Sequence, residues 1–319
     1  MRLLTHDVRI LSTGSATPER VVTNDEIIGG LATSDEWIVA NLGIRERRIA
    51  AGPEDSVSRL ASRAATAALE SADLSPMDLA GIIVATSTPE LAAPSTACLV
   101  QDIIGAHNGA FAFDVQAVCS GFIYSLGVAA ATITAKAADR ILVIGVDTFS
   151  KITDWNDRSC VFFGDGAGAV VVGRDELGAG LLSVVLHADG RGHRGFSVPK
   201  GSPTFVMDAQ AVYKTGIEVL PEAIGEALAL AGLAIDDVDC VIPHQPSRRV
   251  LDETASRLGV STDMVRKNMD RYANTAGATV PLLLDETVRD GDIGDGDTVV
   301  MAAVGSGWTW GAAVYRWQS

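Results

Sequence analysis

The chain carries little positive charge for its size. Its 319 residues include 25 Lys and Arg against 40 Asp and Glu, which gives a net charge of −15 at pH 7. Because nucleic acids and anionic membranes attract positive surfaces, this balance argues against a general binder of either one. An acidic partner would need a local basic patch.

Cysteines are also few, and their spacing is not that of a metal site. The chain has four, Cys98, Cys119, Cys160 and Cys240, with no C-x-x-C pair among them. We therefore expect neither zinc nor a disulfide framework. Residues 1–7 lack the apolar core of a secretory signal. Together these absences predict a protein of the reducing cytoplasm.

No stretch has the pattern of a membrane span, although one comes close. Val115 to Ala135 has no charged residue, which is long enough to suggest a span. Polar side chains such as Gln116 and Ser125 interrupt it, and a β-rich run follows at 141–147. A helix buried on nearly all sides fits better. With 47% hydrophobic and 20% charged residues, the chain has an ordinary globular α/β composition, as two domains or one two-part domain.

The most informative stretch is Ala112 to Asp147. It reads as strand, helix and strand, with Cys119 at the first strand-to-helix junction. A thiol at that point faces the free N–H groups and the positive end of the helix dipole, and both favour the thiolate. The position suits a nucleophile. A buried structural cysteine is the alternative at this stage.

Local patterns predict several other elements. Helices are expected to begin near Thr23 and Ser34, where capping residues precede acidic first turns, and to cover 56–72 and 213–231. Strands are expected at 8–14, 81–86, 162–172 and 238–244. Gly180 to Ser202 is rich in turn residues and is expected to be a surface excursion.

The chain resembles itself at an interval of about half its length. Residues 72–84 align with 231–243 as helix end, acidic turn and buried strand, and 168–171 align with 311–314. Between these anchors Cys119 and Asn274 each precede a helix, so we expect them to be pseudo-symmetric partners. The pattern predicts two fused βα-rich halves, residues 1–173 and 174–319, that meet face to face around a pocket.

Three polar side chains then stand at strand or helix ends: Cys119, His244 and Asn274. A thiolate can attack a carbonyl, an imidazole can handle protons or donate a hydrogen bond, and an amide can orient or donate. The combination is typical of acyl transfer. Each residue also has a simpler explanation, because a histidine after a strand can be structural and Asn274 can be a helix cap.

Seven motifs in order carry a family resemblance over nearly the whole chain. They are residues 33–38 (TSDEWI), 43–47 (GIRER), 119–122 (CSGF), 163–169 (FGDGAGA), 244–245 (HQ), 274–275 (NT) and 305–311 (GSGWTWG). With these motifs the chain resembles the β-ketoacyl-acyl-carrier-protein synthase III family. The resemblance implies a thiolase-like fold, in which two duplicated halves form a layered α-β-α-β-α sandwich.

The resemblance also implies roles. Cys119 would take an acyl group from an acyl-CoA, and His244 and Asn274 would bind the thioester carbonyl of malonyl-acyl-carrier protein as it loses carbon dioxide. Backbone N–H groups of Cys119 and Ser306 would form a second oxyanion hole. The product would be a β-ketoacyl chain. No cofactor is implied beyond the coenzyme A thioester substrate, and the family implies a homodimer.

Contacts to the two substrates follow from the same resemblance. Substrate and coenzyme A contacts are expected from Trp37, Ala93, Arg158 and Tyr213. Docking of the acidic acyl carrier protein is expected from a net positive segment that includes Lys214, Arg249 and Arg257. An interfacial tryptophan and an ordinary solvated helix face are the alternatives.

Some residues depart from the family pattern. Pro246 and Ser247 follow His-Gln, Asn41 stands where an arginine is common, and Ala93 replaces a bulky pocket wall. Ser306 replaces a glycine, which is tolerable if the local torsions allow it. These departures favour a pathway-specific relative over a housekeeping enzyme. The alternative activity passes the acyl group to an oxygen or nitrogen nucleophile; a Cys-His-Asn hydrolase and a non-catalytic partner fit less well.

Overall fold

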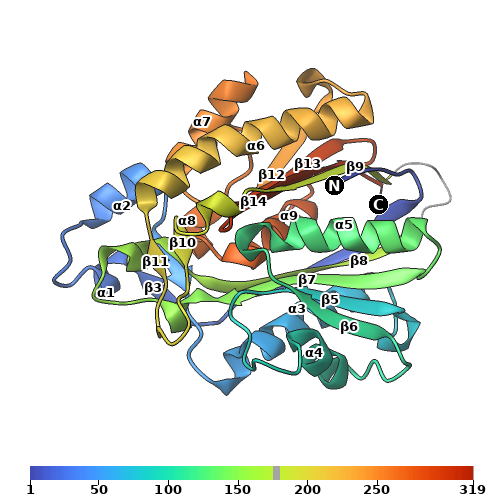
Figure 1. The fold of residues 1–319 in the computed structure, drawn as a ribbon, viewed down its shortest axis with the longest axis horizontal. Coiled ribbons are helices and arrows are strands. Elements are labelled where there is room, and N and C mark those ends of the chain that lie inside the picture. Colours follow the sequence, from blue (N-terminus) through green and yellow to red (C-terminus); the bar gives the residue numbers. More distant parts are fainter. Residues whose placement is uncertain (175–179, 319) are drawn as a thin grey trace.

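The computed structural model describes residues 1–174 and 180–318, and its layers are visible in Figure 1. Two five-stranded sheets are each covered by helices on the outside and share a helical layer between them. The first sheet has the order β2 (Val8–Ala16), β8 (Asp165–Arg174), β7 (Arg140–Thr148), β5 (Gly81–Ala85), β6 (Phe111–Val115). The second has the order β1 (Arg2–Leu4), β9 (Gly180–Ala188), β14 (Thr309–Arg316), β13 (Thr298–Gly305), β12 (Cys240–Pro243).

The helices fill three layers. Outside the first sheet lie α3 (Val57–Ser71) and α4 (Thr96–Ile104), and outside the second lie α6 (Ala209–Ala231) and α7 (Arg248–Leu258). Between the sheets lie α5 (Gly121–Thr134) and α9 (Thr279–Arg289), which contact strands of both. The smaller elements are β3 (Val21–Thr23), α1 (Asn24–Ile27), α2 (Asp35–Leu42), β4 (Glu46–Arg48), β10 (Phe196–Ser197), β11 (Val206–Met207) and α8 (Met269–Tyr272). The predicted five-layer sandwich is therefore confirmed.

The two halves repeat one topology. The strand order β2-β8-β7-β5 in the first sheet corresponds to β9-β14-β13-β12 in the second. In both, one parallel pair (β5 with β7, β12 with β13) is followed by antiparallel neighbours. The chain passes from the first sheet to the second between β8 and β9. Strand β1 is the exception, because it pairs with β9 in the sheet of the second half.

The expectation of a surface excursion from Gly180 is wrong for its first part. Residues 180–188 form β9, an interior strand of the second sheet between β1 and β14. Both faces of this strand are covered, so the alternation that marks a half-exposed strand is missing. Leu181, Val184 and Val185 are buried, and the flanking glycines suggested a loop. Only the part after Ala188 is irregular, apart from the 3-10 turn η6 (Gly190–Gly192) and β10.

Helix α5 explains the uncharged stretch that resembled a membrane span. Its 14 residues lie between the two sheets, and residues on several sides of it, such as Phe122, Ile123 and Ser125, are fully buried. A helix enclosed on several sides needs apolar or small residues around most of its circumference. Among the described residues, no helix combines the length and apolarity of a membrane crossing.

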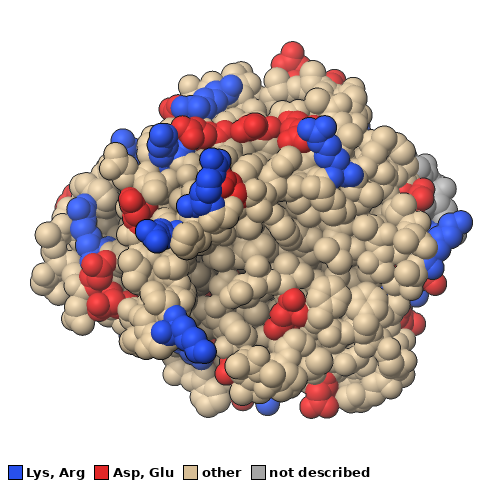
Figure 2. All heavy atoms as spheres, viewed as in Figure 1, with Lys and Arg blue, Asp and Glu red and all other residues tan. Residues whose placement is uncertain are grey.

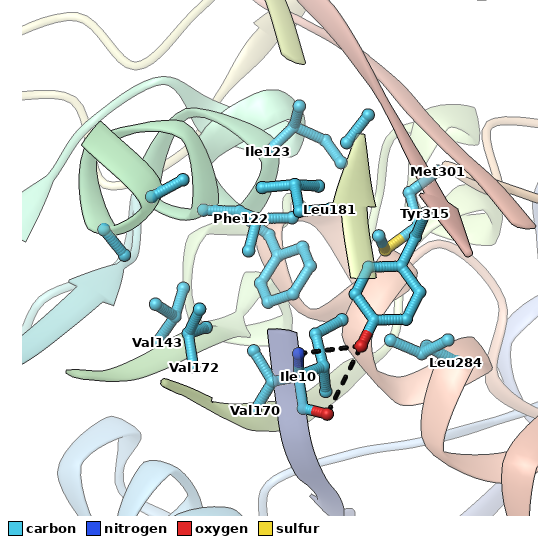
Figure 3. Close-up of a cluster of buried hydrophobic side chains, with 14 of the residues drawn as sticks. Ile10, Phe122, Ile123, Val143, Val170, Val172, Leu181, Leu284, Met301 and Tyr315 are labelled. Atoms are coloured by element: carbon cyan, nitrogen blue, oxygen red, sulfur yellow. Dashed lines mark hydrogen bonds between the residues drawn. The ribbon is translucent and has the colours of Figure 1, made fainter. Parts of the chain in front are cut away.

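A tyrosine hydroxyl joins the two sheets through the central layer. The register of β2 against β8 shifts between Ile10 and Ser12, which removes regular pairing there. The N–H of Ile10 donates to the hydroxyl of Tyr315 (2.9 Å), and this hydroxyl donates to the Ile10 carbonyl (3.4 Å), as Figure 3 shows. Tyr315 belongs to β14 in the other sheet and is fully buried. The bulged strand therefore bonds to the opposite half of the molecule.

Tyr315→Phe should lower the free energy of unfolding by about 1–3 kcal/mol, because both polar groups of Ile10 would remain buried at the bulge without this partner. Urea unfolding measures the change. Tyr124→Phe is the matched control: its hydroxyl donates to the carbonyl of His187 (2.6 Å) in a half-buried position, where water can replace it. Equal losses in the two variants would contradict the role given to Tyr315.

Candidate functional site

Most of the residues predicted for the site surround one cavity. It has a volume of about 210 Å³. Its lining includes Trp37, Cys119, Tyr213, His244, Arg249, Asn274 and Ser306. The first half supplies Trp37 and Cys119, and the second half supplies the rest. The catalytic account required the sulfur, the imidazole and the carboxamide to share a cavity, and they do.

Cys119 lies where the sequence predicted, between a strand and a helix. Strand β6 ends at Val115, the one-turn 3-10 helix η3 (Val118–Ser120) contains the cysteine, and α5 begins at Gly121. Val118 has a φ of 48°, a left-handed torsion that β-branched residues avoid. Such a conformation costs about 1–3 kcal/mol, and surrounding contacts have to maintain it. The turn is thus held in an unfavourable torsion immediately before the thiol.

The pseudo-symmetric partner of Cys119 is Gly277 and not Asn274. In the second half the one-turn helix η8 (Ala276–Ala278) precedes α9, as η3 precedes α5. Ala276 has a φ of 49° and thereby matches Val118. Counting from these two residues places Cys119 opposite Gly277. The expected equivalence with Asn274 is therefore wrong by a few residues, because repeated small residues blurred the alignment.

A buried carboxylate that the sequence did not reveal joins the Gly277 turn to the loop after β5. Asp147, near the end of β7, accepts hydrogen bonds from the N–H of Ser87 (2.7 Å), the hydroxyl of Thr88 (2.9 Å) and the hydroxyl of Thr86 (3.3 Å). Its other oxygen accepts from the N–H of Gly277 (2.8 Å). Burial raises the pKa of Asp147 to about 6, although these donors act in the opposite direction. Nothing in its sequence context distinguished it.

The free thiol is not the thiolate that its place before a helix predicted. Burial raises the pKa of Cys119, and the nearby charge of Asp147 raises it further, against one backbone hydrogen bond that lowers it. Full burial can shift a pKa by several units, whereas a helix terminus contributes about 0.3–2 kcal/mol. Burial therefore dominates, and the free site holds a protonated thiol at neutral pH.

His244 is a neutral imidazole in this environment. It follows β12, and its backbone N–H donates to the carbonyl of Ala302 on β13 (2.7 Å). The residue is 2% exposed, and burial lowers its pKa to about 3. Within the described residues its Nδ1 has no hydrogen-bond partner, so no contact there selects a tautomer. A neutral ring still donates through one nitrogen, as a carbonyl-binding role requires.

Asn274 is held so that one half of its amide stays available. Its side-chain oxygen accepts from the N–H of Ala276 (2.8 Å), and its backbone bonds to the Phe162 carbonyl and the Gly164 N–H (3.0 Å each). A backbone N–H can only donate, so the contacting atom is the amide oxygen, and the NH₂ group remains as a donor at the cavity. The capping and donor interpretations of Asn274 are compatible.

Two cation–π pairs lie at the entrance. The Arg158 guanidinium lies 4.1 Å from the ring centre of Trp37, which is 37% exposed on α2. The Arg249 guanidinium lies 5.6 Å from the ring centre of Tyr213. Arg158 thus reaches the mouth through Trp37 without lining the cavity. Asn41 lines it, and its side chain donates to the Trp37 carbonyl (2.9 Å).

A fully buried arginine, Arg47, connects the segment that carries Trp37 with the segment that carries Arg158. One nitrogen of Arg47 donates to the side chain of Asn24 (2.8 Å), which donates in turn to Asp35, the first residue of α2 (2.7 Å). Another nitrogen of Arg47 donates to the carbonyl of Val161 (3.0 Å). Val161 belongs to η5 (Arg158–Phe162), whereas α2 carries Trp37. Arg47 lay in a quoted motif, but its sequence context gave no sign of this role.

The remaining predicted contacts lie outside the cavity. Ala93 is exposed and does not line the cavity of its own chain. Lys214 and Arg257 are exposed too, and Arg257 bonds to Glu253 on the same helix (2.9 Å). Figure 2 shows basic side chains around α2, α7 and the start of α6, interleaved with acidic ones. The docking residues therefore stay a prediction.

The departures from the family pattern have local explanations. Ser247 caps α7 by accepting from the N–H of Val250 (3.4 Å), and Pro246 lines the cavity. Ser306 has no left-handed torsion, so serine is tolerated there, as its backbone-only role required. Gly305 cannot change in the same way, because a Cβ there would lie 2.6 Å from the Ala117 carbonyl oxygen.

Several cavity residues were not predicted, including Phe163, Phe196, Met207 and Trp308. Phe196 and Met207 come from short strands after β9 that have no pattern of their own. Trp308 belonged to a quoted motif and could have been singled out. All four cysteines are free thiols, and among residues 1–174 and 180–318 no three His, Cys, Asp or Glu side chains gather as metal ligands would.

Known proteins share this architecture over almost its full length. Residues 113–190 match the family model described as 3-oxoacyl-[acyl-carrier-protein (ACP)] synthase III, and residues 228–317 match its C-terminal model. The β-ketoacyl-[acyl-carrier-protein] synthase III of Rhizorhabdus wittichii is 46% identical over 316 residues, which cover 97% of this chain and 98% of the relative.

Solved structures of other proteins have the same fold. The 3-oxoacyl-[acyl-carrier-protein] synthase III of Aquifex aeolicus VF5 has a TM-score of 0.94 and 40% identity, over 97% of this chain and 100% of that chain. The priming β-ketosynthase of the R1128 polyketide pathway has a TM-score of 0.91 and 32% identity, over 97% of this chain and 96% of that chain.

Fold, cavity and relatives together define the class of protein, a thiolase-like ketosynthase, which is a transferase enzyme. The likeness includes both halves and therefore both sides of the cavity. The chain belongs to the 3-oxoacyl-[acyl-carrier-protein] synthase III family.

His244→Gln should change how stability depends on pH. Burial holds the pKa of His244 near 3 in the folded protein, against 6.5 for an unperturbed imidazole. The neutral ring therefore stabilises the fold fully above pH 6.5, and this contribution falls as pH drops towards 3. Between pH 7 and pH 5 the native protein should lose about 2 kcal/mol more than the variant. Urea unfolding at both pH values measures it; parallel losses would contradict a buried neutral imidazole.

Arg47→Lys should lower the free energy of unfolding by about 2 kcal/mol and speed hydrogen exchange in α2, because lysine cannot hold both the Asn24 and Val161 bonds. Arg48→Lys on the same strand is the matched control. Arg48 forms a partly exposed ion pair with Glu46 (2.9 Å), so its change should cost less than about 1 kcal/mol. The role of Arg47 is wrong if the two variants behave alike.

Proposed function

We propose that the chain condenses an acyl group from an acyl-CoA with malonyl-acyl-carrier protein, with loss of carbon dioxide, through an acyl-Cys119 intermediate. The observation that carries the proposal is the shared cavity of Cys119, His244 and Asn274. The family membership and the names of the relatives support the same substrates.

In the first half-reaction the sulfur of Cys119 attacks the thioester carbonyl. The bond from that carbon to the coenzyme A sulfur breaks, and coenzyme A leaves as a thiol with the proton from Cys119. Because the free thiol is protonated, proton removal has to accompany attack, and His244 is a neutral imidazole that lines the same cavity. Backbone N–H groups of Cys119 and Ser306 would stabilise the oxyanion.

In the second half-reaction malonyl-acyl-carrier protein loses carbon dioxide. The electron pair of the broken carbon–carbon bond becomes an enolate, whose oxygen accepts hydrogen bonds from His244 and the Asn274 NH₂ group. The enolate carbon then attacks the acyl-Cys119 carbonyl, the bond to sulfur breaks, and the released Cys119 thiolate takes up a proton from solvent. Neutral donors suit this step, because they stabilise developing charge without being ionised themselves in the free site.

The alternative is transfer of the acyl group to an oxygen or nitrogen nucleophile. It is less favoured, because such a transfer needs no pair of donors for a second thioester carbonyl. We also propose acyl-CoA and a carrier protein as partners, a cytoplasmic location, and a homodimer. Edge strand β6 leaves Phe111 and Phe113 partly exposed (36% and 37%), which supports a further apolar contact there. Service in one specific pathway stays a prediction.

Incubation with acyl-CoA thioesters should add one acyl mass to the intact protein, and Cys119→Ala should abolish the adduct. Asn274→Ala should still acylate Cys119 but release carbon dioxide from malonyl-acyl-carrier protein ~10²–10³-fold more slowly, since one oxyanion donor is lost. Mass spectrometry and carbon dioxide release measure the two steps.

Cys98→Ala is the control for the adduct, because Cys98 is exposed and does not line the cavity. An adduct that persists in Cys119→Ala would reject the nucleophile. Acylation without any carbon dioxide release by the native protein would favour the simple acyltransferase.

A further inference from the structure

The cavity has one wall that comes from a very short β-ribbon. Strands β10 and β11 pair Phe196 with Met207, and both side chains line the cavity. Phe196 packs with Phe149, Phe163 and Phe205 at ring-centre distances of 6.0, 6.0 and 5.2 Å, in a buried cluster that includes Cys119. The position of Phe196 therefore affects the apolar space available beside the sulfur.

This ribbon has little stability of its own. Each strand has two residues, and an isolated ribbon of that length does not persist in water. External contacts therefore have to place it. The segment that follows β13 provides them: Trp308 and Asp189 exchange two backbone hydrogen bonds (2.7 and 2.8 Å). The Trp308 ring also lies against Gly192 and Gly195, where a Cβ would come within 2.0 and 2.4 Å of it.

Ser306 makes the direct connection to the wall. Its hydroxyl donates to the backbone carbonyl of Phe196. The residue before it, Gly305, lies so close to the cysteine turn that a Cβ there would be 3.0 Å from the N–H nitrogen of Cys119. One short segment thus contacts the turn that carries Cys119 through Gly305, and it contacts the wall that carries Phe196 through the Ser306 side chain.

We propose that the Ser306 hydroxyl is a positioning group that sets acyl selectivity by holding Phe196 in place, so that the cavity takes short apolar acyl groups. The inference rests on the proposed function. The volume of about 210 Å³ must hold the acyl group and the end of the thioester arm together. Aromatic and aliphatic side chains on this side provide no partner for a charged acyl group.

The test compares rates of Cys119 acylation by acetyl-CoA and octanoyl-CoA, followed by intact-protein mass spectrometry. In Ser306→Ala the backbone N–H is unchanged, but Phe196 loses its bond. The ratio of the octanoyl rate to the acetyl rate should rise about fivefold, the factor that corresponds to one net hydrogen bond. Phe196→Ala should raise the same ratio, and the double variant should show no further rise.

Ser202→Ala is the matched control. Its hydroxyl also donates to a backbone carbonyl, that of Thr204 (2.8 Å), between the two ribbon strands but outside the cavity lining. It should leave the ratio unchanged. An unchanged ratio in Ser306→Ala, an equal fall in both rates, or effects that add in the double variant would overturn the proposal. Absence of any acyl adduct in the native protein would instead reject the proposed function.

Discussion

The site depends on a backbone-to-backbone contact between the two halves. A Cβ on Gly145 would lie 2.1 Å from the Gly277 carbonyl oxygen, and one on Gly305 would lie 2.6 Å from that of Ala117. Only glycine allows such approach. The contact brings the turns before α5 and α9 together, and these turns, with the ends of β12 and β13, surround the thiol, the imidazole and the amide. Duplication of one βα-rich half provided two similar turns.

Electrostatics at this contact favour neutral reacting groups, although the buried carboxylate of Asp147 lies near the sulfur. Burial keeps His244 neutral and Cys119 protonated, and it raises the pKa of Asp147 towards 6. Asp147 uses its hydrogen bonds to hold Gly277 and the loop after β5, so it acts on the turns instead of the substrate. A low-dielectric site with preplaced neutral donors strengthens its interaction with charge that develops during reaction.

Different contacts hold the entrance of the cavity and its inner wall in place. At the entrance, buried Arg47 connects the segments that carry Trp37 and Arg158. At the inner wall, a two-residue ribbon depends on the segment that carries Ser306 and Trp308. Both arrangements use residues far from the chemistry in sequence.

The sequence by itself determined what depends on local pattern and on order. It predicted the junction at Cys119, the helix of residues 121–134 as a buried one, the strand before His244 and the duplication, because periodicity, caps and strand ends are written in neighbouring residues. It misread residues 180–188, since a strand covered on both faces lacks alternation. It also aligned Cys119 with Asn274 where geometry pairs it with Gly277.

Only the tertiary structure decided which groups share an environment. Contacts between segments distant in the chain determine the protonated state of Cys119 and the burial of the Asp147 carboxylate. They also determine the hydrogen bonds of Arg47 and the position of Phe196 in the cavity wall. Burial and hydrogen bonding set pKa values and side-chain positions, and neither can be read from residue order. The identity of the reactive side chains was therefore visible in the sequence, whereas their protonation states and the shape of the cavity required the fold.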